Sequence, residues 1–182
     1  MDLNPILMKT ALEEAENALK EGEIPVGCVF SCPESAFKGN DTSNFTKLGE
    51  TILVVTGSNK TNKTRNGTAH AELVAIQKLF KSVGSVQACE ILSQCDLHVT
   101  CEPCIMCAAA LKNLGIKCVY FGCCNDRFGG NGSILSIHNG EDGYRVERGL
   151  MEKEAIAIFQ QFYESENRRA PESKRRRKNK ES

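Results

Sequence analysis

Two features are missing from this 182-residue sequence: long apolar runs and a secretory leader. No apolar stretch approaches the ~18–20 residues that a membrane-spanning helix needs, so none is expected. The start, Met1 to Pro5, lacks the basic-then-apolar layout of a secretory signal. We therefore expect a protein that is not secreted, and one whose several Asn-x-Ser/Thr sequences are not glycosylated.

A net charge is also absent, because 23 Lys and Arg balance 23 Asp and Glu. Apolar residues make up 41% and charged residues 25% of the chain, which are ordinary values for a soluble globular protein. The balance hides an asymmetry, since residues 168–182 hold eight basic residues against two Glu. We expect one domain over 1–167, followed by a basic tail over 168–182 that has too little apolar content to be ordered alone.

Cysteine is abundant, with ten residues. Without a secretory signal, a reducing compartment is expected, where thiols bind metal, react or simply pack. Most of these cysteines are expected to pack as small buried hydrophobes. This applies above all to Cys28, Cys118 and Cys123, which lie in or beside apolar, strand-like runs.

Segments with helical spacing of apolar residues alternate with short apolar runs along the chain. The predicted helices cover 7–19, about 69–80, 103–115 and 152–166, and the predicted strands cover 24–30, 52–55, 97–101 and 117–122. Thr68 is the predicted N-cap of the second helix, and residues 31–50 are predicted to form a long loop. Strands alternating with helices indicate a three-layer α/β fold with helices on both faces of one sheet.

Two short stretches carry metal-binding residue types at the starts of predicted helices, His70-Ala71-Glu72 and Pro103-Cys104-Ile105-Met106-Cys107. One imidazole and two thiolates, from His70, Cys104 and Cys107, form a ligand set that zinc prefers. Three protein ligands leave a position for water, which indicates a catalytic site, because a structural zinc normally has four. The two cysteines are three residues apart on a first helical turn, where their sulfurs share one side and the helix dipole favours thiolates.

Glu72 is predicted to move protons rather than to bind the metal. A zinc ion lowers the pKa of water to roughly 7, so a neighbouring carboxylate can accept a proton from that water. The same carboxyl group can then deliver protons to a ring nitrogen and to a departing amine. For Glu72 and His70 to reach one site, two helix N-termini must face each other across a pocket.

Each stretch alone has a simpler interpretation. A His-Ala-Glu tripeptide is usually a solvated helix face, and Pro-Cys-x-x-Cys can be a redox pair or half a zinc ribbon. Cys101 completes a Cys-x₂-Cys-x₂-Cys run that is also typical of iron–sulfur ligation. Two observations argue against an iron–sulfur cluster: the strand-to-helix change at Pro103 directs Cys101 away from Cys104 and Cys107, and no suitable fourth cysteine follows. His98 is expected to be packed or exposed rather than a ligand, and His138 indicates nothing specific.

Five stretches together resemble the tRNA-specific adenosine deaminases, a branch of the cytidine and deoxycytidylate deaminases. The resemblance covers about residues 5–166, and it is closest to the catalytic subunits of the eukaryotic heterodimeric enzymes. The stretches that carry it are Ile-Pro-Val-Gly at 24–27, Gly-Ser-Asn at 57–59, Thr-Ala-His-Ala-Glu at 68–72, and the longer segments 98–110 and 121–135.

The resemblance implies a cytidine-deaminase-like α/β/α fold with a central mixed sheet of about five strands. It implies one Zn²⁺ per chain and hydrolysis of adenosine to inosine at the wobble position of the tRNA anticodon. Glu72 would protonate N1 and later the leaving ammonia, Asn59 would bind the flipped base, and Pro103 would help shape the pocket. The expected partner is a related subunit without the catalytic glutamate, although a homodimer stays open. Two departures from the family pattern are the longer 31–50 segment and Cys101, where an aliphatic residue is usual.

The basic tail has two interpretations beyond a merely solubilising one. It can hold tRNA phosphates, with contacts from Lys174, Arg175, Arg176, Arg177 and Lys178, or it can act as a nuclear import signal. We therefore expect the protein in the nucleus and the cytoplasm. Two other functions stay open: a deaminase of free cytidine, deoxycytidylate or guanine, and a non-catalytic RNA-binding scaffold subunit.

Overall fold

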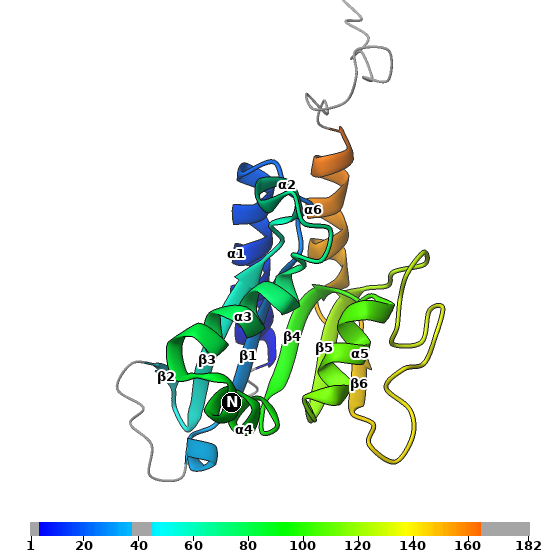
Figure 1. Ribbon diagram of the computed structural model, residues 1–182. Helices are drawn as coiled ribbons and strands as arrows, with labels where there is room; N and C mark the ends of the chain where they lie inside the picture. Colours follow the sequence, from blue (N-terminus) through cyan, green and yellow to red (C-terminus); the bar gives the residue numbers. More distant parts are fainter. Residues whose placement is uncertain (1–3, 38–44, 165–182) are drawn as a thin grey trace, which may run out of the picture.

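The computed structural model describes residues 4–37 and 45–164. Their centre is a six-stranded mixed sheet with the strand order β2-β3-β1-β4-β5-β6 (Figure 1). Strands β2, β3, β1 and β4 are antiparallel neighbours, whereas β4, β5 and β6 run parallel. The strands are β1 (Gly27–Pro33), β2 (Thr46–Leu48), β3 (Thr51–Ser58), β4 (Asp96–Cys101), β5 (Cys118–Cys123) and β6 (Arg145–Arg148).

Helices cover both faces of this sheet, as the sequence predicted (Figure 1). Helices α1 and α6 pack together on one face, while α3, α4 and α5 cover the other. The parallel strands β4 and β5 are joined by α5, the crossover helix that a parallel pair requires. The helices are α1 (Asn4–Lys20), the 3-10 helix η1 (Glu34–Phe37), α2 (Thr61–Thr64), α3 (Ala71–Val83), α4 (Ser85–Leu92), α5 (Ile105–Asn113) and α6 (Glu152–Glu164).

The central strand β1 is buried on both faces, which explains its continuous apolar run. Successive side chains of a strand point to opposite faces, so Cys28 and Phe30 enter the core under α3 and α4. Val29 enters the second core, which α1 and α6 cover. This one strand therefore contributes side chains to both cores, one on each face of the sheet.

Two glycines let helices approach the sheet closely. A Cβ atom at Gly27 would lie 2.2 Å from the carbonyl oxygen of Ala11 in α1. A Cβ atom at Gly57 would lie 2.3 Å from the carbonyl oxygen of Ala71, the first residue of α3. Since real Cβ atoms do not come this close to oxygen, only glycine allows α3 to begin directly over the end of β3.

The sequence prediction of the strands needs three corrections. The sheet has six strands, where the apolar runs predicted four and the resemblance implied about five, because neither short edge strand, β2 or β6, was predicted; the mostly exposed residues of β6 show no alternation. The first strand begins at Gly27 and continues to Pro33 instead of covering 24–30. The predicted 31–50 loop therefore loses its first three residues to β1 and also contains η1 and the edge strand β2.

The predicted N-cap at Thr68 is wrong, because α3 begins at Ala71 and its N-cap is His70. Thr68 instead donates its backbone N–H and its hydroxyl to Asn66 Oδ1, which forms a turn before the helix. Helices α2 and α4 were also not predicted, because four and eight residues are too few for a clear helical period.

Two expectations about individual side chains are confirmed. Cys28, Cys118 and Cys123 are buried. His98 is packed: its ring stacks on Tyr120 with centroids 4.6 Å apart, and its Nε2 lies 3.0 Å from Asn4 Oδ1. Within the described ranges, no helix combines the length and the hydropathy needed to cross a bilayer.

Candidate active site and metal centre

The two predicted metal-binding stretches occupy equivalent positions at the starts of two helices. His70 is the N-cap of α3 with φ −72° and ψ 158°, and Cys104 is the N-cap of α5 with φ −68° and ψ 167°. Both helices lie on the same face of the sheet (Figure 1). Extended dihedrals at both N-caps direct the side chains past the helix ends, where they meet.

His70, Cys104 and Cys107 form a compact set of ligand atoms. The Nδ1 atom of His70 lies 3.5 Å from Cys104 Sγ and 3.7 Å from Cys107 Sγ. All three ligand atoms lie within 4.8 Å of one another. Ligand atoms of a tetrahedral zinc bonded at about 2.0–2.3 Å are separated by distances of this order, so the three residues fit a zinc ion.

The protonation of the three groups also suits a cation. The hydrogen bond with Cys107, aided by His70, lowers the pKa of Cys104 to about 4, which favours its thiolate form. The same contact with Cys104, together with burial, raises the pKa of Cys107. The hydrogen bond with Cys104 raises the pKa of His70. The raised pKa values favour the protonated forms of His70 and Cys107 when no cation is bound. A cation that binds displaces these protons, because thiols and imidazoles bind metal in their deprotonated forms.

Glu72 lies beside this set, on the first turn of α3, and is only 3% exposed. Burial raises the pKa of its carboxyl group above the ordinary glutamate range. A carboxyl group whose pKa moves toward neutrality can both accept and donate a proton in one reaction. The position and the environment of Glu72 therefore suit proton transfer at the metal site.

An open cleft of about 1240 Å³ leads to these residues. His70, Glu72 and Cys104 line one part of it, and α6 supplies another wall, with Phe159 and Tyr163 among its residues. The exposed surface of the lining is mostly apolar, but polar and charged side chains also line the cleft, both beside the metal ligands and on α6, where Gln160 is one of them. Such a lining is typical of sites that bind a flat organic ligand and orient it by a small number of hydrogen bonds.

Of the other predicted site residues, some line the cleft and others do not. Asn59 is buried and lines the cleft, as a base-binding residue must. Pro103 is buried but does not line the cleft; its carbonyl accepts a hydrogen bond of 2.9 Å from Gly130. Cys101 is outside the ligand set; it is a free thiol that forms a side-chain hydrogen bond with Cys123, its register partner on the neighbouring strand. The tail residues 174–178 lie outside the described residues.

Glu102 has a role that the sequence analysis missed. Its carboxylate is 2% exposed and accepts hydrogen bonds from the backbone N–H groups of Asn125, Asn131 and Ser133 at 2.9, 2.9 and 3.1 Å, and from the Ser133 hydroxyl. Burial alone raises the pKa of Glu102, but these hydrogen bonds outweigh burial and lower it below the ordinary value. Glu102 thereby holds the loop after β5 against the start of α5.

Comparisons with known proteins agree with this geometry. A family model described as the cytidine and deoxycytidylate deaminase zinc-binding region matches residues 1–123. The chain is 41% identical over 175 residues to the tRNA-specific adenosine deaminase subunit tad2 of Schizosaccharomyces pombe. This match covers 93% of this chain but only 40% of the yeast protein. It is 37% identical over 179 residues to tRNA-specific adenosine deaminase 2 of Xenopus laevis, which covers 94% of this chain and 92% of that protein.

A solved structure is similar as well. It comes from a study of A-to-I editing by tRNA:A34 deaminases at the wobble position, and it matches with a TM-score of 0.67 and 28% identity. The match covers 84% of this chain and 98% of the other. The shared fold therefore extends well beyond the metal-binding motifs.

Proposed function

Because the chain belongs to the zinc-dependent cytidine and deoxycytidylate deaminases, and within them to the tRNA-specific adenosine deaminases, we propose that it converts adenosine to inosine at the wobble position of tRNA. Water is consumed and ammonia is released. The proposal depends on one observation above all: His70, Cys104 and Cys107 form a three-ligand zinc set with Glu72 buried beside it.

The residues of this chain have separate roles in the reaction. His70, Cys104 and Cys107 hold the zinc ion, which when bound supplies the Lewis acidity that lowers the pKa of a water to roughly 7. Glu72 accepts one proton of that water and delivers it to N1 of adenine. It then accepts the proton of the hydroxyl group added at C6 and delivers it to the departing amine. Burial favours this role, because it raises the pKa of Glu72 and keeps other water molecules from the proton path.

The cleft fits a base that has left a stack rather than a base inside a duplex. Its mostly apolar walls can contact both faces of a purine, and Asn59 can bind the edge of the ring. Bases of an anticodon loop are already unpaired, so turning one of them into the cleft costs less free energy than extracting a paired base.

The proposed assembly is a heterodimer with a related subunit that lacks the catalytic glutamate. Glu72 marks this chain as the active half. We further propose that the basic residues of 168–182 bind tRNA phosphates and that the protein is present in the nucleus and the cytoplasm. Deleting 168–182 is expected to weaken tRNA binding and to make log Kd less dependent on log salt concentration; unchanged binding with an unchanged slope contradicts the phosphate role.

The central experiment uses a tRNA transcript with adenosine at the wobble position. The full chain is incubated with it alone, with the related subunit, and as the Glu72→Gln variant of the pair. Inosine is detected as an A-to-G change after reverse transcription, and zinc is measured by mass spectrometry. We expect editing by the intact pair and a fall of about 10²–10⁴-fold in the variant, with zinc retained, because only the proton transfer is removed.

The other outcomes separate the alternative functions. If the protein binds zinc and deaminates free cytidine or guanine but not tRNA, the site acts on a small-molecule substrate. Bound zinc without turnover of any substrate indicates a scaffold subunit. Editing by the chain alone removes the related subunit from the catalytic unit but leaves the proposed reaction in place.

A further inference from the structure

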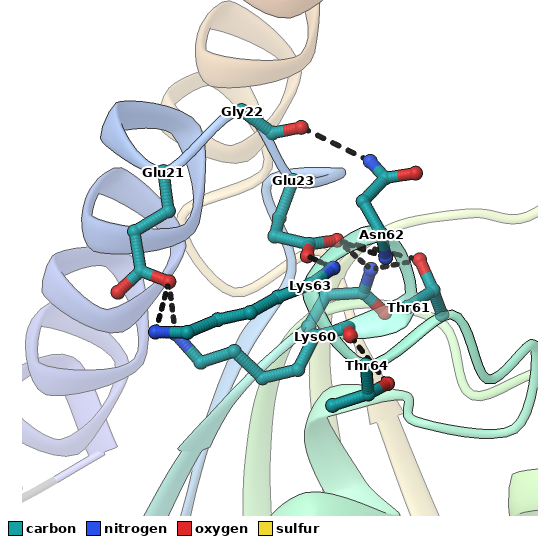
Figure 2. Close-up of polar contacts among 9 residues, drawn as sticks. Glu21, Gly22, Glu23, Lys60, Thr61, Asn62, Lys63 and Thr64 are labelled. Atoms are coloured by element: carbon teal, nitrogen blue, oxygen red, sulfur yellow. Dashed lines mark hydrogen bonds and ion pairs between the residues drawn. The ribbon is translucent and has the colours of Figure 1, made fainter. Parts of the chain in front are cut away.

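Glu23 is a fully buried carboxylate between α1 and β1, at 0% exposure (Figure 2). It accepts hydrogen bonds from the backbone N–H groups of Asn62 at 2.9 Å and Lys63 at 2.6 Å. The Thr61 hydroxyl and the Asn59 side-chain amide also donate to its Oε2 atom, each at 3.4 Å. Four donors from one short segment therefore converge on a single carboxylate.

One of these donors belongs to the cleft. Asn59 is 3% exposed and lines the cleft, and its Nδ2 atom donates to Thr61 Oγ1 at 2.9 Å as well as to Glu23. A carboxylate only accepts hydrogen bonds, so the nitrogen end of the Asn59 amide must face Glu23. Its Oδ1 atom accepts no hydrogen bond from the residues that the structure describes. This orientation leaves an acceptor for a ligand in the cleft.

The segment that Glu23 anchors also leads to a metal ligand. The Asn59 backbone N–H donates to Val26 at 3.0 Å, and the Lys60 N–H donates to Ala69 at 2.9 Å. The second bond closes residues 60–69 into a loop, and His70 follows directly. Glu23 therefore fixes the start of a loop whose two ends carry Asn59 and His70.

A neighbouring glutamate offers a natural comparison. Glu21 is on the same connection but 40% exposed, and it forms ion pairs with Lys60 at 2.9 Å and Lys63 at 3.4 Å (Figure 2). Its hydrogen bond with Lys60 lowers its pKa. Exposed ion pairs of this kind contribute little to stability. Both glutamates thus contact the same segment, but only Glu23 is buried against its backbone and against Asn59.

We propose that Glu23 is a positioning residue for the deamination: it orients the Asn59 carboxamide so that the oxygen faces the substrate base. The inference rests on the proposed function, because it takes the cleft as the nucleobase site. An oriented oxygen acceptor favours a base that presents an amino group over one that presents only acceptors at that edge. Glu23 acts on the substrate only through Asn59 and does not touch it.

The test is a double-mutant cycle on the full chain with its partner subunit, using tRNA with a wobble adenosine. The variants are Glu23→Gln, Asn59→Ala, their combination, and the matched control Glu21→Gln. Glutamine in place of Glu23 puts an amide NH₂ group among donors, so the Asn59 amide is no longer fixed. We expect kcat/KM to fall about tenfold for Glu23→Gln, mainly through KM, as the loss of one oriented hydrogen bond predicts.

Further readouts separate positioning from folding. Glu23→Gln is expected to add less than about threefold to the loss caused by Asn59→Ala, because residues that act as one unit are not additive. Glu21→Gln is expected to stay within about twofold of the unchanged protein, since its ion pairs are exposed. Zinc content and the unfolding midpoint are measured for every variant. Glu23→Asp, which keeps the charge but shortens the side chain, is measured in parallel.

Three results would overturn the inference while leaving the proposed function intact. The first is an unchanged KM in both Glu23 variants. The second is an equal loss from Glu23→Gln whether or not the Asn59→Ala substitution is also present. The third is loss of zinc or of the native unfolding transition in both variants, which would make Glu23 a folding residue. Failure of the unchanged protein to edit tRNA would instead refute the proposed function, and this inference with it.

Discussion

The hydrogen bonds around Glu102 give a stability prediction that the structure makes quantitative. Its Oε1 atom accepts the N–H groups of Asn131 and Ser133, and its Oε2 atom accepts the Asn125 N–H group and the Ser133 hydroxyl. The Glu102→Gln substitution replaces one oxygen by an NH₂ group. The Ser133 hydroxyl can rotate and accept, but at least one backbone N–H group then faces another donor.

An unpaired buried donor costs about 1–3 kcal/mol, and the remaining hydrogen bonds lose the strength that a charged acceptor gives them. We therefore expect Glu102→Gln to lower the free energy of unfolding by about 2–4 kcal/mol. Urea unfolding of the zinc-loaded protein measures this change. The matched control is Glu141→Gln, an exposed position in the segment before β6, for which a change within about 0.5 kcal/mol is expected.

The pH dependence supplies a second arm of the same experiment. Because the folded-state pKa of Glu102 is lowered, its contribution to stability is fully present above the unfolded pKa and is lost as the pH falls through the folded value. The stability difference between the unchanged protein and Glu102→Gln should therefore shrink below about pH 4.5. A loss below about 0.5 kcal/mol at neutral pH, or a difference that grows on acidification, would refute the reasoning that the carboxylate holds the loop.

Two further predictions concern the metal centre and the packing beneath it. Cys107→Ser is expected to reduce bound zinc well below one ion per chain, because a hydroxyl group is a far weaker zinc ligand than a thiolate; full zinc content by mass spectrometry would contradict the ligand assignment. Gly57→Val is expected to destabilise the fold by about 1–3 kcal/mol or more, because its Cβ atom would lie 2.3 Å from the Ala71 carbonyl oxygen. Thermal unfolding measures this change, with Gly67→Ala as the control, because a Cβ atom at Gly67 meets nothing within 4 Å. Equal unfolding midpoints for the two variants would contradict the close approach of Gly57 to α3.

The sequence predicted most reliably what depends on neighbouring residues. His70, Cys104 and Cys107 were recognisable as zinc ligands because their spacing and the nearby helix starts are local features. The four longer helices and four of the strands were recognisable because apolar periodicity extends over enough residues to be read. The exact start of α3 was not, because Thr68 is a favoured N-cap residue type, whereas the actual N-cap, His70, makes no side-chain cap hydrogen bond and gives no such signal.

The sequence indicated that the two helix starts face one site, but only the tertiary structure shows how they come together. The sequence determined that an imidazole, two thiols and a carboxyl group stand at helix starts, but His70 and Cys104 are far apart in the chain. The strand order brings them together, because α3 and α5 cover the same face of the sheet. The roles of Glu23 and Glu102 were equally hidden. Each accepts hydrogen bonds from backbone N–H groups more than 20 positions away, and backbone groups leave no signature in a sequence.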